Sequence, residues 1–150
     1  MRKIADKRDS EKLFHAARSE FLDAFAKLEA TIRFVQDLAG LPDRSEPLIE
    51  KLATLRDPAR CPAFSERRGE RVRGLLENME DLIYKRNTVV HSIMSLDHTE
   101  QTGSEAKFIN PKCHADGTSL GYRFTIEEMR KLICEVELKS QNLSDPQMLG

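Results

Sequence analysis

Apolar residues recur at three- and four-residue spacing along four stretches of the chain, which is the pattern of helices with one buried face. The first stretch keeps this spacing from Phe14 to Ala39 as a narrow, heptad-like seam, suited to packing against another long helix, inside the core or between two chains. The predicted helices cover residues 10–39, about 45–56, 65–95 and 125–141.

Residues that start and stop helices support these boundaries. Ser10 is placed to act as the N-cap of the first helix, and Gly40 is placed to end it. Thr125 and Glu128 have the spacing of a capping box, in which each side chain bonds the other residue's backbone N–H. The last helix is therefore expected to begin at Thr125.

The helical pattern is interrupted between residues 96 and 121, where glycines and an Asn-Pro pair indicate turns. Within this interruption, residues 107–110 and 120–124 are predicted to pair as a short hairpin. We therefore expect an all-α fold, a bundle of four to five helices with a small β-hairpin-like insertion over about 96–124. One domain over residues 1–143 and a flexible tail over 144–150 complete the prediction.

Composition narrows the function classes. The 150 residues are 33% charged with a net charge of −1, so the protein as a whole should not be attracted to nucleic acid or membranes, and a charged site must be local. Aromatic residues are 6% and tryptophan is absent, which argues against a broad base-stacking surface. The three cysteines are widely spaced, as in a reduced cytoplasmic protein, and no metal site, cofactor or membrane segment is predicted.

One arginine is out of place in this pattern. Arg86 falls in the middle of the apolar face of the third predicted helix, and arginine is almost never fully buried unless it is paired. Beside it, Tyr84, Asn87 and His91 recur at three- and four-residue spacing with Glu80 as a polar stripe. The apolar face itself is formed by Val72, Leu75, Leu76, Met79, Leu82, Ile83, Val90 and Ile93. An ion pair with Glu80, with Asp81 or with an acidic residue of the first predicted helix would explain Arg86, and so would a functional site.

The segment Arg86-Asn87-Thr88-Val89-Val90-His91, late in a helix of an all-helical chain, resembles the signature of the HEPN domain superfamily, an arginine followed after four to six residues by a histidine. Many members of that superfamily are metal-independent ribonucleases of toxin–antitoxin and antiviral systems, and others are non-catalytic dimerising modules. The resemblance implies Arg86, Asn87 and His91 as catalytic residues, RNA as the substrate, and an antitoxin or regulatory protein as a further partner.

Residue chemistry fits RNA cleavage through the 2′-OH. Histidine exchanges protons near neutral pH, and the arginine fork matches two phosphoryl oxygens. Asn87 precedes His91 by one helical turn, so its amide can orient the imidazole or bind phosphate. Five further residues, four basic and one aromatic, are predicted to contact RNA: Arg67, Arg68, Arg71, Tyr84 and Lys85. A solvated, salt-bridged face is the alternative for these arginines.

The spacing of the two main residues sets a geometric condition. Arg86 and His91 are separated by about 140° around an unbroken helix, so they do not converge easily within one chain. Either the helix is kinked at Thr88-Val89-Val90, or two chains form one site, as in HEPN ribonucleases. We therefore predict a homodimer through the motif helix. The alternative is a non-catalytic helical module that dimerises and binds a nucleotide or a protein.

Overall fold

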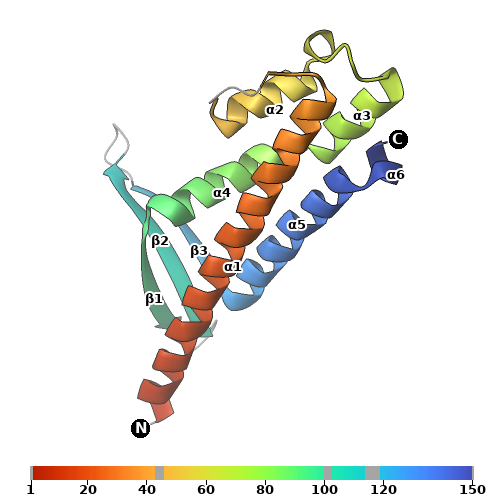
Figure 1. Ribbon diagram of the computed structural model, residues 1–150. Helices are drawn as coiled ribbons and strands as arrows, with labels where there is room; N and C mark the ends of the chain where they lie inside the picture. The colour runs from red at the N-terminus through yellow and green to blue at the C-terminus, as the bar shows by residue number, and fades with distance from the viewer. Residues whose placement is uncertain (1, 43–45, 100–102, 114–118, 150) are drawn as a thin grey trace. The chain divides into compact units, whose positions relative to one another are not determined.

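The computed structural model describes residues 2–42, 46–99, 103–113 and 119–149 (Figure 1). It is mainly helical, as the all-α prediction expected, and it also contains one small antiparallel sheet. The elements, in chain order, are α1 (Arg2–Leu38), α2 (Leu48–Arg56), the 3-10 turn η1 (Pro58–Arg60), α3 (Glu66–Leu75), α4 (Met79–His91), β1 (Ile93–Thr99), β2 (Gly103–Cys113), β3 (Ser119–Thr125), α5 (Ile126–Ser144) and α6 (Pro146–Leu149).

Contacts group the residues into two compact units, and the division passes through α1, α4 and α5. The first unit contains the chain up to Asp23 together with Tyr84–Cys134. The second unit contains Ala24–Ile83 and the chain from Glu135 onward. Each unit is described below by its own contacts.

The sheet of the first unit has the order β1-β2-β3, with both pairs antiparallel. Ala106 pairs with Phe124, and Phe108 lies two residues further along β2, so all three share the buried face of the sheet. The rings of Phe108 and Phe124 meet edge to face with centroids 5.9 Å apart. The buried helical residues of this unit are Phe14, Ala17, Phe21, Thr88, Val89, Met129, Leu132 and Ile133.

The predicted hairpin is present, because Lys107 of β2 pairs with Arg123 of β3. A third strand, β1, was not predicted, and it pairs with β2 from Ile93↔Ile109 to Thr99↔Gly103. The insertion is therefore a three-stranded sheet rather than a hairpin. Its solvent face carries exposed ion pairs from Arg123 to Asp97 at 3.4 Å and to Glu105 at 3.8 Å.

The second unit is helical. Gly40 follows α1 with φ +71°, as expected for a glycine that ends a helix. Lys139 of α5 donates to the backbone oxygen of Glu77 at 3.0 Å and to that of Leu75 at 3.5 Å, which are carbonyls beyond the hydrogen-bonding reach of α3. The core residues are Ala24, Phe25, Leu28, Ile32, Val35, Ala39, Leu52, Leu55, Cys61, Val72, Leu76, Met79, Leu82, Ile83, Val136 and Leu143.

Two predicted helix boundaries are wrong. The first helix begins at Arg2, so Ser10 lies inside it. Backbone N–H groups at that position already bond to carbonyls of the same helix and need no cap. The single helix predicted over residues 65–95 is two helices, α3 and α4, separated by a turn at Leu76–Asn78. Asn78 has φ +62°, a left-handed conformation that asparagine tolerates better than most residues and that ends a helix.

The predicted helix starts at Ser65 and Thr125 are confirmed. Ser65 accepts a hydrogen bond from the Arg68 N–H at 3.1 Å and begins α3. Thr125 and Glu128 form the reciprocal capping box, with both bonds at 3.2 Å. The residues predicted as a flexible tail, 144–150, include the short helix α6, where Arg71 donates to the backbone oxygen of Gln147 at 3.0 Å.

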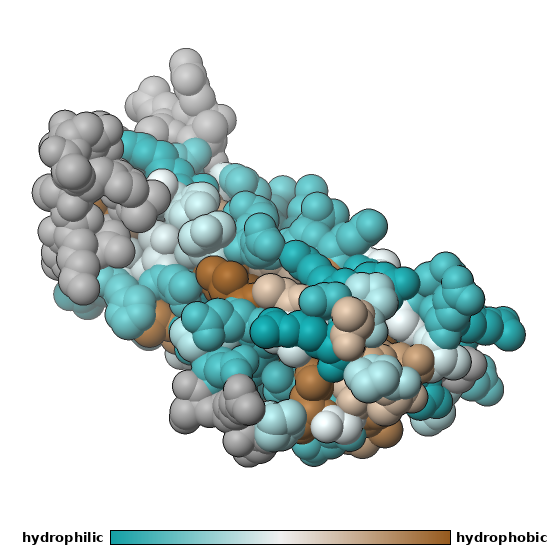
Figure 2. All heavy atoms as spheres, turned by 90° about the horizontal axis from the view of Figure 1, so that it is seen from above, coloured by the Kyte–Doolittle hydropathy of each residue, from teal (hydrophilic) through white to brown (hydrophobic). Residues whose placement is uncertain are grey.

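The described surface agrees with the high charge content. On the face drawn in Figure 2, hydrophilic residues cover most of the surface and hydrophobic ones form smaller patches. No helix within the described residues has the length and apolar character needed to cross a membrane.

Candidate functional site

The later half of α4 carries the predicted catalytic residues in the first unit. The helix is continuous from Met79 to His91, with Glu80 and Asp81 in its first turn and His91 as its last residue. Acidic residues at the start and a basic residue at the end both match the helix dipole, which explains why this segment is helical despite three consecutive β-branched residues.

Arg86 and Asn87 are joined to each other. Nη1 of Arg86 donates to Oδ1 of Asn87 at 3.0 Å, and the side chains are partly buried. The amide oxygen of Asn87 therefore faces a cation, and its NH₂ group is the part that can donate to an anion. The structure places Asn87 beside Arg86, whereas the sequence left open whether it would orient His91 or bind phosphate.

His91 is exposed to solvent at the C-terminal end of α4. Within the described part of the chain, its imidazole has no hydrogen bond or ion pair. The exposed imidazole can thus be reached by an incoming ligand, as a proton-transfer group requires.

The helix bears on the two geometries left open by the sequence. α4 is helical without interruption through Thr88, Val89 and Val90, which gives no support to a break in the helix there. Arg86 and His91 therefore project about 140° apart, and one chain does not bring them to the same point. The first unit therefore contains the predicted site residues, but it does not bring the side chains of Arg86 and His91 together.

Burial along α4 explains why Arg86 is not in a buried centre. The buried residues of the second-unit part are Met79, Leu82 and Ile83, whereas those of the first-unit part are Thr88 and Val89. Within the first unit, the buried direction midway between Thr88 and Val89 lies about 110° around the helix from Arg86. Val90, predicted to be on the apolar face, is consequently 36% exposed, and that prediction is wrong.

The polar stripe is accessible in its first-unit part. Tyr84 is 57% exposed and lies on the same side of α4 as Asn87 and His91, which follow it at three- and seven-residue spacing. The fourth member, Glu80, belongs to the second unit, where it forms an ion pair with Arg56 at 3.0 Å.

The predicted RNA-contacting arginines belong to a different unit from the predicted catalytic residues. Arg67 is exposed, whereas Arg68 and Arg71 are partly buried, and all three lie on α3 in the second unit. Arg71 uses its guanidinium on the backbone of Gln147. Lys85 lies in the first unit and is partly buried.

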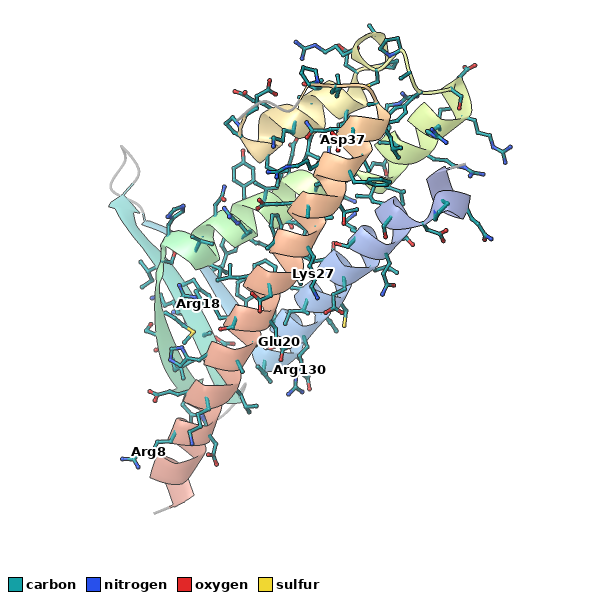
Figure 3. All side chains as sticks on the ribbon, viewed as in Figure 1. Arg8, Arg18, Glu20, Lys27, Asp37 and Arg130 are labelled. Atoms are coloured by element: carbon teal, nitrogen blue, oxygen red, sulfur yellow. The ribbon has the colours of Figure 1, made fainter. Side chains whose placement is uncertain are left out.

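A second arginine, Arg18, supports the end of α4 and was missed by the sequence analysis. Its Nη2 donates to the backbone oxygen of Val89 at 2.8 Å and to that of Ser92 at 3.5 Å, and its guanidinium lies 5.8 Å from the ring centroid of Phe108 (Figure 3). Arg18 follows Phe14 by four residues, within the apolar seam of α1, so the rule that singled out Arg86 could have found it.

Among the described residues, no group of three or more His, Cys, Asp or Glu side chains is close enough to hold a metal ion. Cys113 and His114 are adjacent in the sequence and could supply half of a zinc site, but His114 is not among the residues that the structure describes. No family model, curated protein or solved structure matches this chain.

Proposed function

We propose that this protein is a metal-independent endoribonuclease of the HEPN type that cleaves RNA by transesterification through the 2′-OH. The observation that supports this proposal is the hydrogen-bonded pair Arg86 and Asn87, followed one helical turn later by the exposed His91 on the same helix. The resemblance of these residues to the HEPN signature supplies the reaction class.

Each residue has a role that follows from its chemistry. The 2′-oxygen attacks phosphorus as its proton passes to a base, and the 5′-oxygen leaves as it gains a proton, which yields a 2′,3′-cyclic phosphate and a 5′-OH. His91 serves as the base or the acid. Arg86 stabilises the charge on the phosphoryl oxygens, with its fork held by Asn87, whose NH₂ group donates to the same phosphate.

The angular separation of Arg86 and His91 makes the second copy of the chain part of the proposal. Two α4 helices related by a two-fold axis can place Arg86 of one copy beside His91 of the other. Tyr84 and Val90, both exposed on α4, supply apolar area for such an interface. A monomeric protein that is fully active would contradict this arrangement.

The test uses purified wild-type protein, Arg86→Ala and His91→Ala with end-labelled RNA in EDTA, and circular dichroism shows whether each variant is folded. We expect wild type to leave cyclic phosphate ends, and each variant to be slower by about 10²–10⁴-fold, the usual contribution of such groups. Matched controls are Arg130→Ala and His15→Ala, which remove exposed residues of the same types from the first unit outside α4.

Mixing the two inactive variants tests the composite site. If Arg86 and His91 act across two chains, the mixture recovers about a quarter of the wild-type rate, because half of the dimers are mixed and one of their two sites is intact. If they act within one chain, the mixture stays inactive. A wild-type protein that dimerises but cleaves no RNA would favour the non-catalytic dimerisation module.

The biological setting of a toxin or a phage-defence protein follows from the same resemblance. Expression of the wild type should then arrest growth of the host, and His91→Ala should not. Growth arrest by both proteins would indicate toxicity unrelated to the proposed reaction.

A further inference from the structure

A cavity in the second unit is independent of the proposed nuclease site. It has a volume of about 340 Å³ and is bordered by the residues after α2 and by one side of α3. Its polar wall comes from Ser65, Glu66 and Arg73, and Cys61 contributes a buried thiol. This volume is at the lower end of the range for small-molecule sites, so a ligand of few atoms would fit.

Arg73 is the distinctive group in this cavity. Its side chain is partly buried, yet among the described residues it forms no ion pair or hydrogen bond. Glu66 lines the same cavity but is exposed and does not pair with it. An arginine withdrawn from water usually has an anionic partner, so this guanidinium is left with unused donors facing an open space.

Gly69 makes room for the guanidinium. It is buried within α3, and a Cβ atom at this position would lie 3.1 Å from Nη1 of Arg73. Glycine costs about 1 kcal/mol relative to alanine inside a helix. Gly69 weakens the helix, and it occupies a position where a Cβ atom would crowd the guanidinium of Arg73.

The neighbouring thiol does not supply the missing negative charge. Burial, with a smaller effect from the Asp57 carboxylate, raises the pKa of Cys61, although the charge of Arg73 acts in the opposite direction. Its S–H donates to the backbone oxygen of Thr54 at 3.4 Å. Cys61 is therefore a neutral donor near Arg73 at ordinary pH.

The walls define the chemistry of an occupant. Leu55 and Phe64 add apolar surface to the cavity, and the first turn of α3 at Ser65 favours negative charge nearby. The planar fork of Arg73 fits a carboxylate through two parallel hydrogen bonds. Glu66 disfavours a ligand with several negative charges. We propose that this cavity binds a small monocarboxylate, with its carboxylate on Arg73 and its apolar body against Leu55 and Phe64.

The position of Cys61 provides a direct measurement of occupancy. In a Cys113→Ser, Cys134→Ser background, Cys61 is the single thiol, and its alkylation by iodoacetamide requires an empty cavity. Benzoate serves as the probe and benzamide as its neutral analogue. At ten times its dissociation constant, benzoate should slow alkylation about tenfold, since about one molecule in eleven is then unoccupied.

Variants identify the group that binds. Arg73→Met should remove the protection by benzoate, and Gly69→Ala should weaken it, because the added Cβ atom crowds the guanidinium at 3.1 Å. Arg67→Met removes an exposed arginine from the same helix and should leave protection unchanged. The proposal is overturned if benzamide protects as well as benzoate, if Arg73→Met is still protected, or if benzoate gives no saturable protection at about 10 mM, ten times a 1 mM dissociation constant.

Discussion

Replacement of Arg18 by methionine tests whether this arginine supports the helix end that carries His91. Methionine keeps most of the aliphatic stem and removes the guanidinium. Arg18 reaches the carbonyl of Val89, which has no partner in its own helix because α4 ends at His91, two residues later. Val89 is fully buried, so water does not readily replace the lost donor.

The expected cost follows from the contacts. A hydrogen bond from a charged donor contributes about 1.5–3 kcal/mol, and the cation–π contact with Phe108 adds about 0.5–1 kcal/mol. Allowing for partial solvation of the exposed part of the side chain, we expect Arg18→Met to lower the free energy of unfolding by about 2–3 kcal/mol. For a chain of this length, that corresponds to a fall in melting temperature of about 5–10 °C.

Thermal and urea unfolding followed by circular dichroism measure this change, and Arg8→Met is the matched control. Arg8 lies on the same helix and is exposed, as Figure 3 shows, so its replacement removes the same charge without the contacts. Amide hydrogen exchange in the last turn of α4 should also become faster in Arg18→Met. Equal stabilities of the two variants would refute the assigned role of Arg18.

Three further predictions concern individual elements. Thr125→Ala and Glu128→Ala should each lower stability by about 1 kcal/mol, and less than additively in the double variant, because both belong to one capping box; additive urea-unfolding energies would contradict this. Asn78→Val should destabilise by about 1–2 kcal/mol and Asn78→Gly should be tolerated, since only the β-branched side chain conflicts with φ +62°; equal melting temperatures would argue against a left-handed turn. The raised pKa of Cys61 means that the folded protein keeps this proton where the unfolded chain releases it, so its contribution to stability is present below pH 9.0 and is lost as the pH rises above that value. Thiolate absorbance in a Cys113→Ser, Cys134→Ser background measures this pKa, and a midpoint for folded Cys61 at pH 9.0 would show that the shift is absent.

The features that sequence reasoning predicted correctly have local causes. Ser65 and the pair Thr125 and Glu128 start helices through bonds to residues three positions away, and Gly40 ends one through its own backbone angle. The hairpin of β2 and β3 likewise joins strands that are close in sequence. Each of these signals lies within a few residues of the structure that it determines.

The missed features lack such a signal. Val72, Leu76, Met79 and Leu82 keep helical spacing across the turn at Leu76–Asn78, so periodicity alone gives no sign that the helix stops. In β1, Met94-Ser95-Leu96-Asp97 alternates with the two-residue period of a strand. Four residues of alternation after a long helical pattern were too few to outweigh it, and the partner strand that stabilises β1 begins beyond them.

The two arginines show what a charge within an apolar pattern can and cannot establish. The expectation that an arginine within an apolar helical face needs a partner or a function assumes that this face is buried along the whole helix. The assumption holds for the seam of α1 around Arg18, between the buried Phe14 and Phe21. It fails for α4, because the first-unit part of this helix buries Thr88 and Val89 and exposes Val90. Arg18 is accordingly explained by packing and by the helix end that it caps, whereas Arg86 must be judged by what its guanidinium can bind. For that reason the decisive evidence on Arg86 is its behaviour toward a phosphate on RNA, together with His91 of a second copy, and not its place in the hydrophobic pattern.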